Sequence, residues 1–478
     1  MKFQSINRTV FLQLVFFLLG ISAIPYMSSA QSVPFSVKEN LFDQSNTNTL
    51  GLDYVSGVET VTVFSPTDDT DKFSNGVVMA AFKGSLYCMW QSSATDEDAA
   101  DTWVAYSRSD DDGKTWSAPM VLAETLDDGY CSSGGWIATS DTLVGFINTW
   151  PSGLSPKGGY TRYVKSSDGL NWSEPAEVKM KNGSRLEAVF EQDPHVLANG
   201  RIVNAAHFQP GLLVCPIYTD DPLGITGWEK GRFSHTGSGD QSRELEPSLY
   251  QRKDGTIVMV FRDQNSTYYK LASESKDNGE TWSHSVLTNM PDARTKQSAG
   301  NLPDGTSYLV GNPVTDKTRI PLAITLSTDG VFFDKAYLIR EGGLSMPALR
   351  YEGKAKRLGY HYPKSMVDGD FLYVAYALNK EDVQYTRIPL NSVSLPASVT
   401  DIDAGRRVIG VVNGILYVDC ETEIVKNIEV YNISGACCLT HSYARSSCEC
   451  DLSDLRRGLY VVKVTTDSAI HTSMILLE

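Results

Sequence analysis

Short stretches rich in β-branched and aromatic residues, several of them alternating in polarity, recur along most of the chain. Residues 102–106 and 257–261 are two clear cases. Alternation puts successive side chains on opposite faces of a strand, so these stretches predict β-strands of antiparallel sheets. With 478 residues, the chain is long enough for two or three domains, and we expect them to be all-β.

One motif separates pairs of predicted strands at a regular interval. It places Ser, Asp, Gly and an aromatic residue in a fixed order, and it occurs at 109–116, 166–172, 275–282 and 327–333. Trp228 falls near the middle of the one double interval, between Trp172 and Trp282. A fixed period means that one supersecondary unit is repeated. Six periods of about 55 residues fit between residues 55 and 390, which predicts a six-bladed β-propeller.

Turn chemistry explains the motif. In its first copy, the side chains of Ser109 and Asp111 can accept hydrogen bonds from nearby N–H groups, and Gly113 can supply a positive φ. Trp116 can then fold over the turn and bury a large apolar surface. We therefore expect the motif to stabilise hairpins rather than to take part in catalysis.

The start of the chain differs from the rest. Lys2 and Arg8 precede an apolar run, and small residues follow at 28–30, which is the pattern of a secretory signal peptide over residues 1–30. Residues 31–54 are polar and are expected to form a lead-in segment before the first repeat.

The end of the chain forms a second unit. A linker is expected at 391–405, and residues 406–478 again contain alternating stretches, which predict a small β-sandwich. Segments 430–435 and 457–464 resemble the C-terminal sorting domains with which Bacteroidetes-type bacteria send proteins through the outer membrane. That resemblance implies a secreted or cell-surface protein and contact with the outer-membrane secretion machinery. An accessory β-sandwich is the alternative.

Charge and cysteine content limit the possible functions. The net charge of −15 argues against nucleic acid as a partner, because a basic face is its usual footprint. A small anionic substrate remains compatible, since a local arginine cluster can override a distant field. Cys448 and Cys450 lie in the tail with a spacing that matches no usual zinc site, so we expect neither a metal nor a cofactor.

One hairpin of the expected propeller carries a pair of opposite charges. Glu246 and Arg262 stand on either side of an Asp-Gly turn at 254–255. Adjacent antiparallel strands would bring the two side chains together. Taken alone, this pattern fits an active-site pair and a surface ion pair equally well.

With this hairpin, the chain resembles the bacterial sialidase superfamily over about residues 55–390. Glu246 and Arg262 precede one box, Arg319 precedes the next, and Tyr362 precedes the last strands, in the order of that family. The resemblance implies a glycoside hydrolase in which Tyr362 is the nucleophile and Glu246 its base. Arg262 and Arg319 would bind the carboxylate of an acidic sugar.

The implied residue types suit a substrate with a carboxylate on its anomeric carbon. Such a carboxylate repels an Asp or Glu nucleophile, whereas a neutral Tyr hydroxyl avoids the repulsion. A tyrosine with a pKa near 10 needs a base. The acid is expected in the loop 96–101, where the resemblance implies Asp98. Tyr360 is the fallback nucleophile, because alternation puts residues 360 and 362 on one face.

The chain departs from the sialidase pattern in its first repeat. The arginine that opens the first blade in that family is missing, and the strand reads Phe-Ser-Asn-Gly at 73–76. Arg294, in a polar loop at 292–301, is the candidate replacement as a substrate-binding residue. The departure leaves acidic sugars other than sialic acid, and neutral sugars, as possible substrates.

Two other functions fit the same expected fold. His195 is a candidate for substrate binding, and together with Tyr362 it could share the base and acid roles of a lyase that acts on uronic-acid polysaccharides. His195 could equally be a structural histidine. The third possibility is a propeller that binds glycans without catalysis. In all three cases the expected partner is a glycan or a glycoconjugate.

Overall fold

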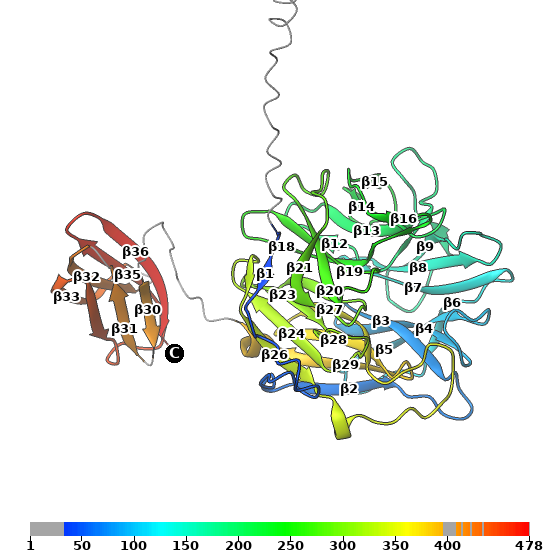
Figure 1. Ribbon diagram of the computed structural model, residues 1–478, viewed down its shortest axis with the longest axis horizontal. Coiled ribbons are helices and arrows are strands. Elements are labelled where there is room, and N and C mark those ends of the chain that lie inside the picture. The colour runs from blue at the N-terminus through cyan, green and yellow to red at the C-terminus, as the bar shows by residue number, and fades with distance from the viewer. Residues whose placement is uncertain (1–32, 395–407, 413, 421–422, 433–434, 478) are drawn as a thin grey trace, which may run out of the picture.

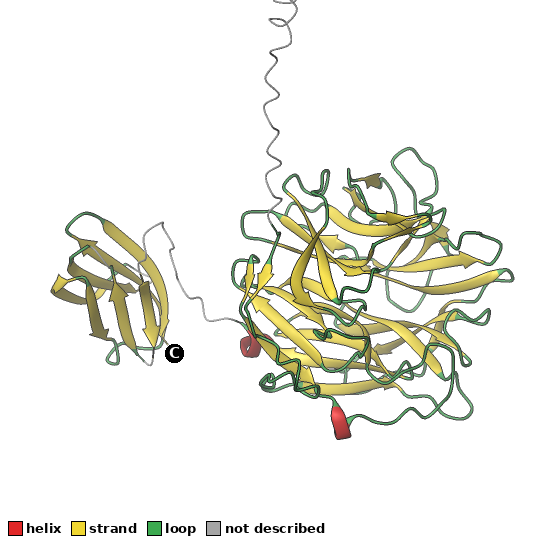
Figure 2. Ribbon diagram, viewed as in Figure 1, coloured by secondary structure: helices red, strands yellow, loops and turns green. Residues whose placement is uncertain are grey.

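The computed structural model describes residues 33–394, 408–412, 414–420, 423–432 and 435–477. The expected signal peptide and most of the expected linker lie outside the described residues. Nearly all regular elements are strands (Figure 2), which confirms the all-β prediction. The exceptions are the short helices η1 (Gly343–Ser345) and α1 (Leu390–Val393). In the described part of the chain, no helix is long and apolar enough to span a membrane.

Six antiparallel sheets account for most of residues 59–389 (Figure 1). The first three contain β3 (Phe73–Phe82), β4 (Ser85–Ser93), β5 (Trp103–Ser109) and β6 (Met120–Ala123); β7 (Gly129–Ala138), β8 (Leu143–Pro151), β9 (Tyr160–Ser166) and β10 (Ala176–Glu177); and β11 (Ala188–Phe190), β12 (His195–Val196), β13 (Ile202–Phe208), β14 (Leu213–Thr219) and β15 (Glu229–Lys230). The others contain β18 (Glu244–Gln251), β19 (Ile257–Asp263), β20 (Tyr269–Ser275) and β21 (Val286–Pro291); β22 (Ser298–Asn301), β23 (Ser307–Gly311), β24 (Leu322–Ser327) and β26 (Lys335–Arg340); and β27 (Tyr360–Asp368), β28 (Phe371–Leu378), β29 (Asp382–Pro389) and β2 (Glu59–Phe64).

The first strands of these sheets contact one another in order. Strand β3 contacts β7, β7 contacts β11, the third sheet contacts β18, β18 contacts β22, β22 contacts β27, and β27 contacts β3 again. Strand β2 pairs with β29, so that the last sheet joins the start and the end of this region. Side chains near the ends of six different strands can therefore lie close to one another.

The repeated motif forms the turn after the third strand of a sheet. In the first copy, the Gly113 N–H donates to Ser109 Oγ at 2.9 Å, and the Trp116 indole donates to the Gly113 carbonyl. Trp228 is fully buried and makes the same kind of bond, from Nε1 to the Gly224 carbonyl at 2.8 Å. Asp221 accepts bonds from the N–H groups of the same turn. The turn-stabilising role of the motif is confirmed.

The lead-in segment is part of the packed structure. Strand β1 (Ser36–Val37) pairs in parallel with β25 (Phe332–Phe333). Phe35 is buried and contacts the rings of Tyr250 and Phe333 edge-on. Its burial anchors the segment, because a buried aromatic ring contributes a large apolar contact area. A further two-stranded pair, β16 (Gly237–Ser238) and β17 (Gln241–Ser242), precedes β18.

The tail forms two sheets with a core of their own. One contains β30 (Val408–Val412), β31 (Ile415–Asp419) and β34 (Ser447–Asp451); the other contains β32 (Val425–Asn432), β33 (Cys437–Arg445), β35 (Gly458–Thr466) and β36 (Ile470–Leu477). Leu416 from the first sheet and Ile428 and Val462 from the second belong to one buried cluster. All members of this cluster lie in the tail.

Candidate active site

Two strands carry matching irregularities near their N-terminal ends. The register of β18 shifts between Leu245 and Ser248, and that of β27 shifts between His361 and Lys364. Glu246 and Tyr362 lie within these bulges with φ angles of 49° and 53°, which are uncommon for residues that carry a Cβ. A bulge redirects a side chain, and strained backbone of this kind occurs often at functional sites.

Tyr362 is surrounded by cations. The Arg319 guanidinium carbon lies 4.6 Å from its ring centroid, and the ammonium groups of Lys296 and Lys380 lie at 5.0 and 5.6 Å. Burial raises the pKa of Tyr362, and the Glu246 carboxylate raises it further. No described residue forms a hydrogen bond with its hydroxyl, which leaves that oxygen available for a substrate.

Glu246 is held by groups on two sides. Its Oε2 accepts a bond from Arg262 Nη1 at 3.0 Å, which confirms that the predicted hairpin brings these charges together. Burial alone would raise the pKa of Glu246, but Arg262 and then Lys296 outweigh burial and keep it below the ordinary value. The Glu246 N–H also donates to His207 Nε2. An ionised carboxylate in this position can act as a base.

The predicted approach of Tyr362 to Glu246 is met only in part. The carboxylate is near enough to raise the pKa of the tyrosine. Among the described residues, however, no hydrogen bond joins the two side chains. The Glu246 carboxylate accepts its bond from Arg262 instead. Proton transfer between them would need a shorter contact than the structure has.

Arg319 is fixed by a neutral histidine. Its Nη1 donates to His361 Nδ1 at 2.9 Å, and His361 Nε2 donates to the carbonyl of Arg357 at 2.9 Å. Burial, followed by the Arg319 charge, keeps the pKa of His361 well below the ordinary value, so the ring is neutral and can accept. Burial and the Arg319 charge also lower the pKa of Arg357, which belongs to the same cation group.

A second carboxylate pairs with a lysine that the sequence analysis did not select. Lys296 Nζ lies 2.5 Å from Glu191 Oε2, and Glu191 Oε1 lies 3.6 Å from His207 Nδ1. Lys296 lies in the polar loop 292–301, and Glu191 lies four residues before His195. No periodic pattern distinguishes these two positions.

The acidic loop presents Glu97, rather than Asp98, to this group. Glu97 Oε1 lies 2.5 Å from Lys380 Nζ, and the Glu97 charge contributes to the raised pKa of Tyr362. Asp98 has a φ of 60° and forms an ion pair with Lys157 at 2.7 Å. The Lys157 ammonium lies over the rings of aromatic residues in the second sheet. Asp98 thus pairs with a lysine of the second sheet rather than with the cations around Tyr362.

Two other candidate residues, Tyr360 and Arg294, form no bond with the carboxylates of this group in the described structure. Tyr360 is 2% exposed, donates to the Glu341 carbonyl at 2.7 Å and packs against Tyr376. The expectation that residues 360 and 362 share a face is wrong, because the bulge in β27 interrupts alternation. Arg294 has a φ of 53°, and its Nε is buried without a hydrogen-bond partner. In the described structure it makes no ion pair with the carboxylates around Tyr362.

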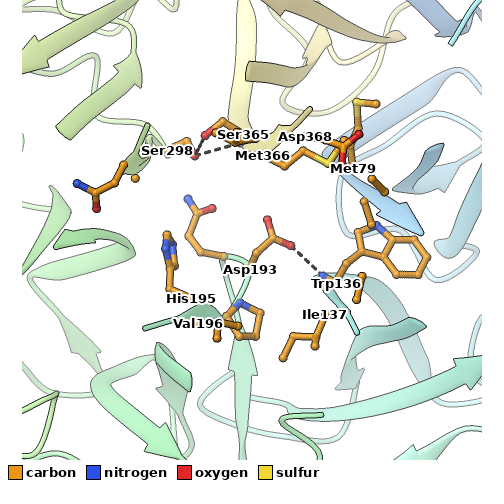
Figure 3. Close-up of a pocket in the computed structure, with 18 of the residues that line it drawn as sticks. Met79, Trp136, Ile137, Asp193, His195, Val196, Ser298, Ser365, Met366 and Asp368 are labelled. Carbon is orange, nitrogen blue, oxygen red and sulfur yellow. Dashed lines mark hydrogen bonds between the residues drawn. The ribbon is translucent and has the colours of Figure 1, made fainter. Parts of the chain in front are cut away.

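His195 lies at the other ends of the first strands. It lines a cavity of about 530 Å³ together with Asp193, Met366 and Asp368 (Figure 3). Tyr362 and Asp368 are six residues apart along β27, which corresponds to about 20 Å in an extended strand. Burial lowers the pKa of His195 to about 4, so the ring is neutral. A lyase that pairs His195 with Tyr362 therefore stays a prediction, to which the described structure adds no contact between the two residues.

The group around Tyr362 has an excess of positive charge although the whole chain is acidic. Three carboxylates face five cationic side chains: Glu97, Glu191 and Glu246 against Arg262, Lys296, Arg319, Arg357 and Lys380. Such an excess attracts an anionic ligand, and the guanidinium groups are suited to forked bonds with a carboxylate.

The profile of the BNR repeat-like domain family matches residues 84–374. The profile of the secretion system C-terminal sorting domain matches residues 412–478, which confirms the resemblance of the tail. No curated protein sequence is similar enough to match the chain.

Solved structures with a similar fold include several sialidases. A protein of unknown function from Dyadobacter fermentans has a TM-score of 0.55 at 16% identity, over 70% of this chain and all of that one. The intramolecular trans-sialidase of Ruminococcus gnavus has a TM-score of 0.53 at 14% identity, over 70% and 98% of the two chains. The NanB sialidase of Streptococcus pneumoniae has a TM-score of 0.53 at 15% identity, over 70% and 71%. At these identities the likeness concerns the fold.

Proposed function

Because this chain belongs to the BNR repeat-like domain family, we propose that it is an exported glycoside hydrolase that releases a terminal acidic sugar from glycans. The observation that carries this proposal is the position of Tyr362, with its hydroxyl unbonded, between the ionised Glu246 and a group of cations. A tyrosine so placed suits a substrate whose own carboxylate would repel a carboxylate nucleophile.

The fold supports a site of this kind. We propose that the six sheets of residues 55–390 are the blades of a β-propeller and that residues 406–478 form a separate β-sandwich. The cyclic order of contacts between the first strands and the closure of the last sheet by β2 support the propeller. The sorting-domain match supports export to the cell surface or the medium through the secretion machinery.

The proposed reaction has two steps. The Tyr362 oxygen attacks the anomeric carbon while Glu246 takes its proton, and the bond to the leaving oxygen breaks as Glu97 donates a proton to that oxygen. Water then attacks the same carbon, gives its proton to Glu97 and releases Tyr362, which recovers its proton from Glu246. Arg262 and Arg319 bind the substrate carboxylate throughout.

The proposal can be tested by incubating the purified protein with sialyl, uronyl and neutral glycans and identifying the products by mass. A hydrolase adds water, whereas a lyase produces a sugar with a new double bond. A binding protein leaves the glycan intact. We expect hydrolysis of an acidic glycan.

The Tyr362→Phe variant should lose several powers of ten in turnover, and Glu246→Gln about 10²–10⁴-fold. Tyr360→Phe is the matched control. It also removes a tyrosine hydroxyl, only two residues from Tyr362, but that hydroxyl bonds to the Glu341 carbonyl outside the group. Full activity in both Tyr362→Phe and Glu246→Gln would refute the proposal.

A further inference from the structure

The bulge that carries Glu246 interrupts the hydrogen-bond ladder between β18 and β19. Glu246 and Pro247 stand together opposite Phe261. Pro247 has no N–H, and the Glu246 N–H donates to His207 Nε2 rather than to β19. Two backbone donors are thus missing from the ladder, which leaves carbonyl groups to be satisfied from outside the hairpin.

Gln297 supplies donors at this point from the loop that precedes β22. The residue is fully buried. Its Nε2 donates to the Glu246 carbonyl at 2.9 Å and to the Val260 carbonyl at 3.1 Å. One of these carbonyls belongs to β18 and the other to β19, so a single amide joins the two strands across the bulge.

A buried ion pair fixes the orientation of this amide. Lys270 Nζ donates to Gln297 Oε1 and to Asp292 Oδ1, both at 2.9 Å. The side chains of Lys270 and Asp292 are only 2% and 1% exposed. An ammonium group can only donate and a backbone carbonyl can only accept, so Oε1 must face Lys270 and Nε2 must face the strands. A buried pair adds little net stability by itself, and an orienting role accounts for it better.

The main chain of Gln297 is held as well. Its carbonyl accepts a hydrogen bond from Gln192 Nε2. The preceding residue, Lys296, forms the ion pair with Glu191. Two consecutive residues of the loop are therefore attached to two consecutive residues that follow β11, which gives the amide a fixed position from which to hold the bulge.

We propose that Gln297 is a positioning residue, which holds the bulge of β18 so that the Glu246 carboxylate lies beside Tyr362. The inference rests on the proposed function of the Tyr362 site, in which Glu246 is the base. Gln297 acts through Glu246 and touches no reacting atom. The positive φ of Glu246 is strained, so the bulge should relax when the amide is removed. A misplacement of about 1 Å can lower a rate about 100-fold.

Gln297→Met removes the amide at nearly constant length and tests this role. With the acidic glycan that the protein hydrolyses as substrate, kcat should fall about 10–100-fold, because the base acts in the chemical step. KM should stay within about twofold of wild type. Gln384→Met is the matched control, since it also removes a buried amide, one that bonds to Thr62 and Arg340 in another sheet. It should lower the melting temperature and leave kcat unchanged. A wild-type kcat in folded Gln297→Met would overturn the assignment.

A double-mutant cycle distinguishes positioning from a general structural role. In the Glu246→Gln background, Gln297→Met should change kcat by less than about twofold, because the base through which it acts is already lost. An amide that only supports the fold would lower kcat by the same factor in both backgrounds. Full multiplication of the two single losses in the double variant would therefore overturn the positioning role.

Gln297→Glu provides a second variant if Gln297→Met does not fold, which thermal melting shows. Its carboxylate keeps an acceptor for Lys270 but, while ionised, cannot donate to the two carbonyls, so it should show a similar loss of kcat. A wild-type kcat in Gln297→Glu would overturn the role. An impaired Glu246→Gln beside a normal Gln297→Met would overturn only this inference, whereas full activity in Glu246→Gln would overturn the assignment of the base as well.

Discussion

Arg262 donates to Glu246 at 3.0 Å across the hairpin of β18 and β19, and this pair keeps a buried carboxylate ionised beside Tyr362. Sixteen residues separate the two in sequence, and the hairpin register sets Leu245 opposite Arg262. The bulge that follows gives Glu246 its positive φ and its place near Tyr362. One extra residue in the strand thus brings an ion pair formed by a simple hairpin into the group around Tyr362.

The two neighbouring acids of the loop should differ in their effect. Glu97→Gln should lower hydrolysis of glycosides with poor leaving groups about 10²–10³-fold and have a smaller effect on 4-nitrophenyl glycosides, because a good leaving group needs no acid. Asp98→Asn should stay within about threefold of wild type on both, since its partner is the exposed Lys157. Steady-state rates with paired substrates measure this difference. Equal losses in the two variants would contradict it.

The activity should persist to a low pH. The pKa of Glu246 lies below its ordinary value of 4.5, so the base is ionised above that lowered pKa and loses its charge only as the pH falls through it. The acid limb of kcat/KM should therefore have its midpoint below about 4.5.

Arg262→Met removes the cation that lowers the pKa of Glu246 most, so it should move this acid midpoint to a higher pH. The partly buried Arg387 pairs with the exposed Glu59 and Asp112, and Arg387→Met serves as the control that leaves the midpoint unchanged. A midpoint that stays in place in Arg262→Met would show that Glu246 is not the group being titrated.

The structural role of the repeated turn can be tested at Trp228. Because its side chain is fully buried, Trp228→Ala should lower the free energy of unfolding by about 3–5 kcal/mol. Leu344→Ala, at a fully exposed position, should change it by less than about 0.5 kcal/mol. Denaturant unfolding measures both. The rate per folded molecule should be unaffected, because the buried cluster around Trp228 contains no residue of the Tyr362 group.

Strand patterns predicted the scaffold better than the site. Alternation and the turn motif depend on local chemistry, so the sheets and the box tryptophans could be predicted, and Trp228 could be placed by its interval. The order of residues along the chain identified four candidates for the site, and the structure brings these together: Glu246, Arg262, Arg319 and Tyr362.

The differences between expectation and structure fall where the backbone leaves the strand pattern. The bulge in β27 separates Tyr360 from Tyr362, and the positive φ of Asp98 accompanies a loop in which Glu97 faces the cations. Lys380 reaches the first strand from a turn about 300 residues later, so no local pattern reveals it. His195 was selected because it and His207 stand on either side of a hairpin, and it lines the cavity that also contains Asp368.

Removal of the tail should separate export from catalysis. The tail has its own core, and the buried clusters of residues 35–393 contain none of its residues. A chain that ends at residue 405 should fold and keep its activity but accumulate in the periplasm. Cell fractionation and activity of the purified truncation measure the two effects. Loss of activity in the folded truncation, or its normal appearance outside the cell, would contradict this division.

The most direct test of the central claim is to identify the residue that bonds to the sugar. A fluorinated acidic sugar with a good leaving group slows the second step, so that the sugar stays attached to the nucleophile. Peptide mass spectrometry should find one added sugar on the peptide that contains Tyr362, and none in Tyr362→Phe. A protein that hydrolyses the parent glycoside while the label appears on another residue, or on none, would contradict the account.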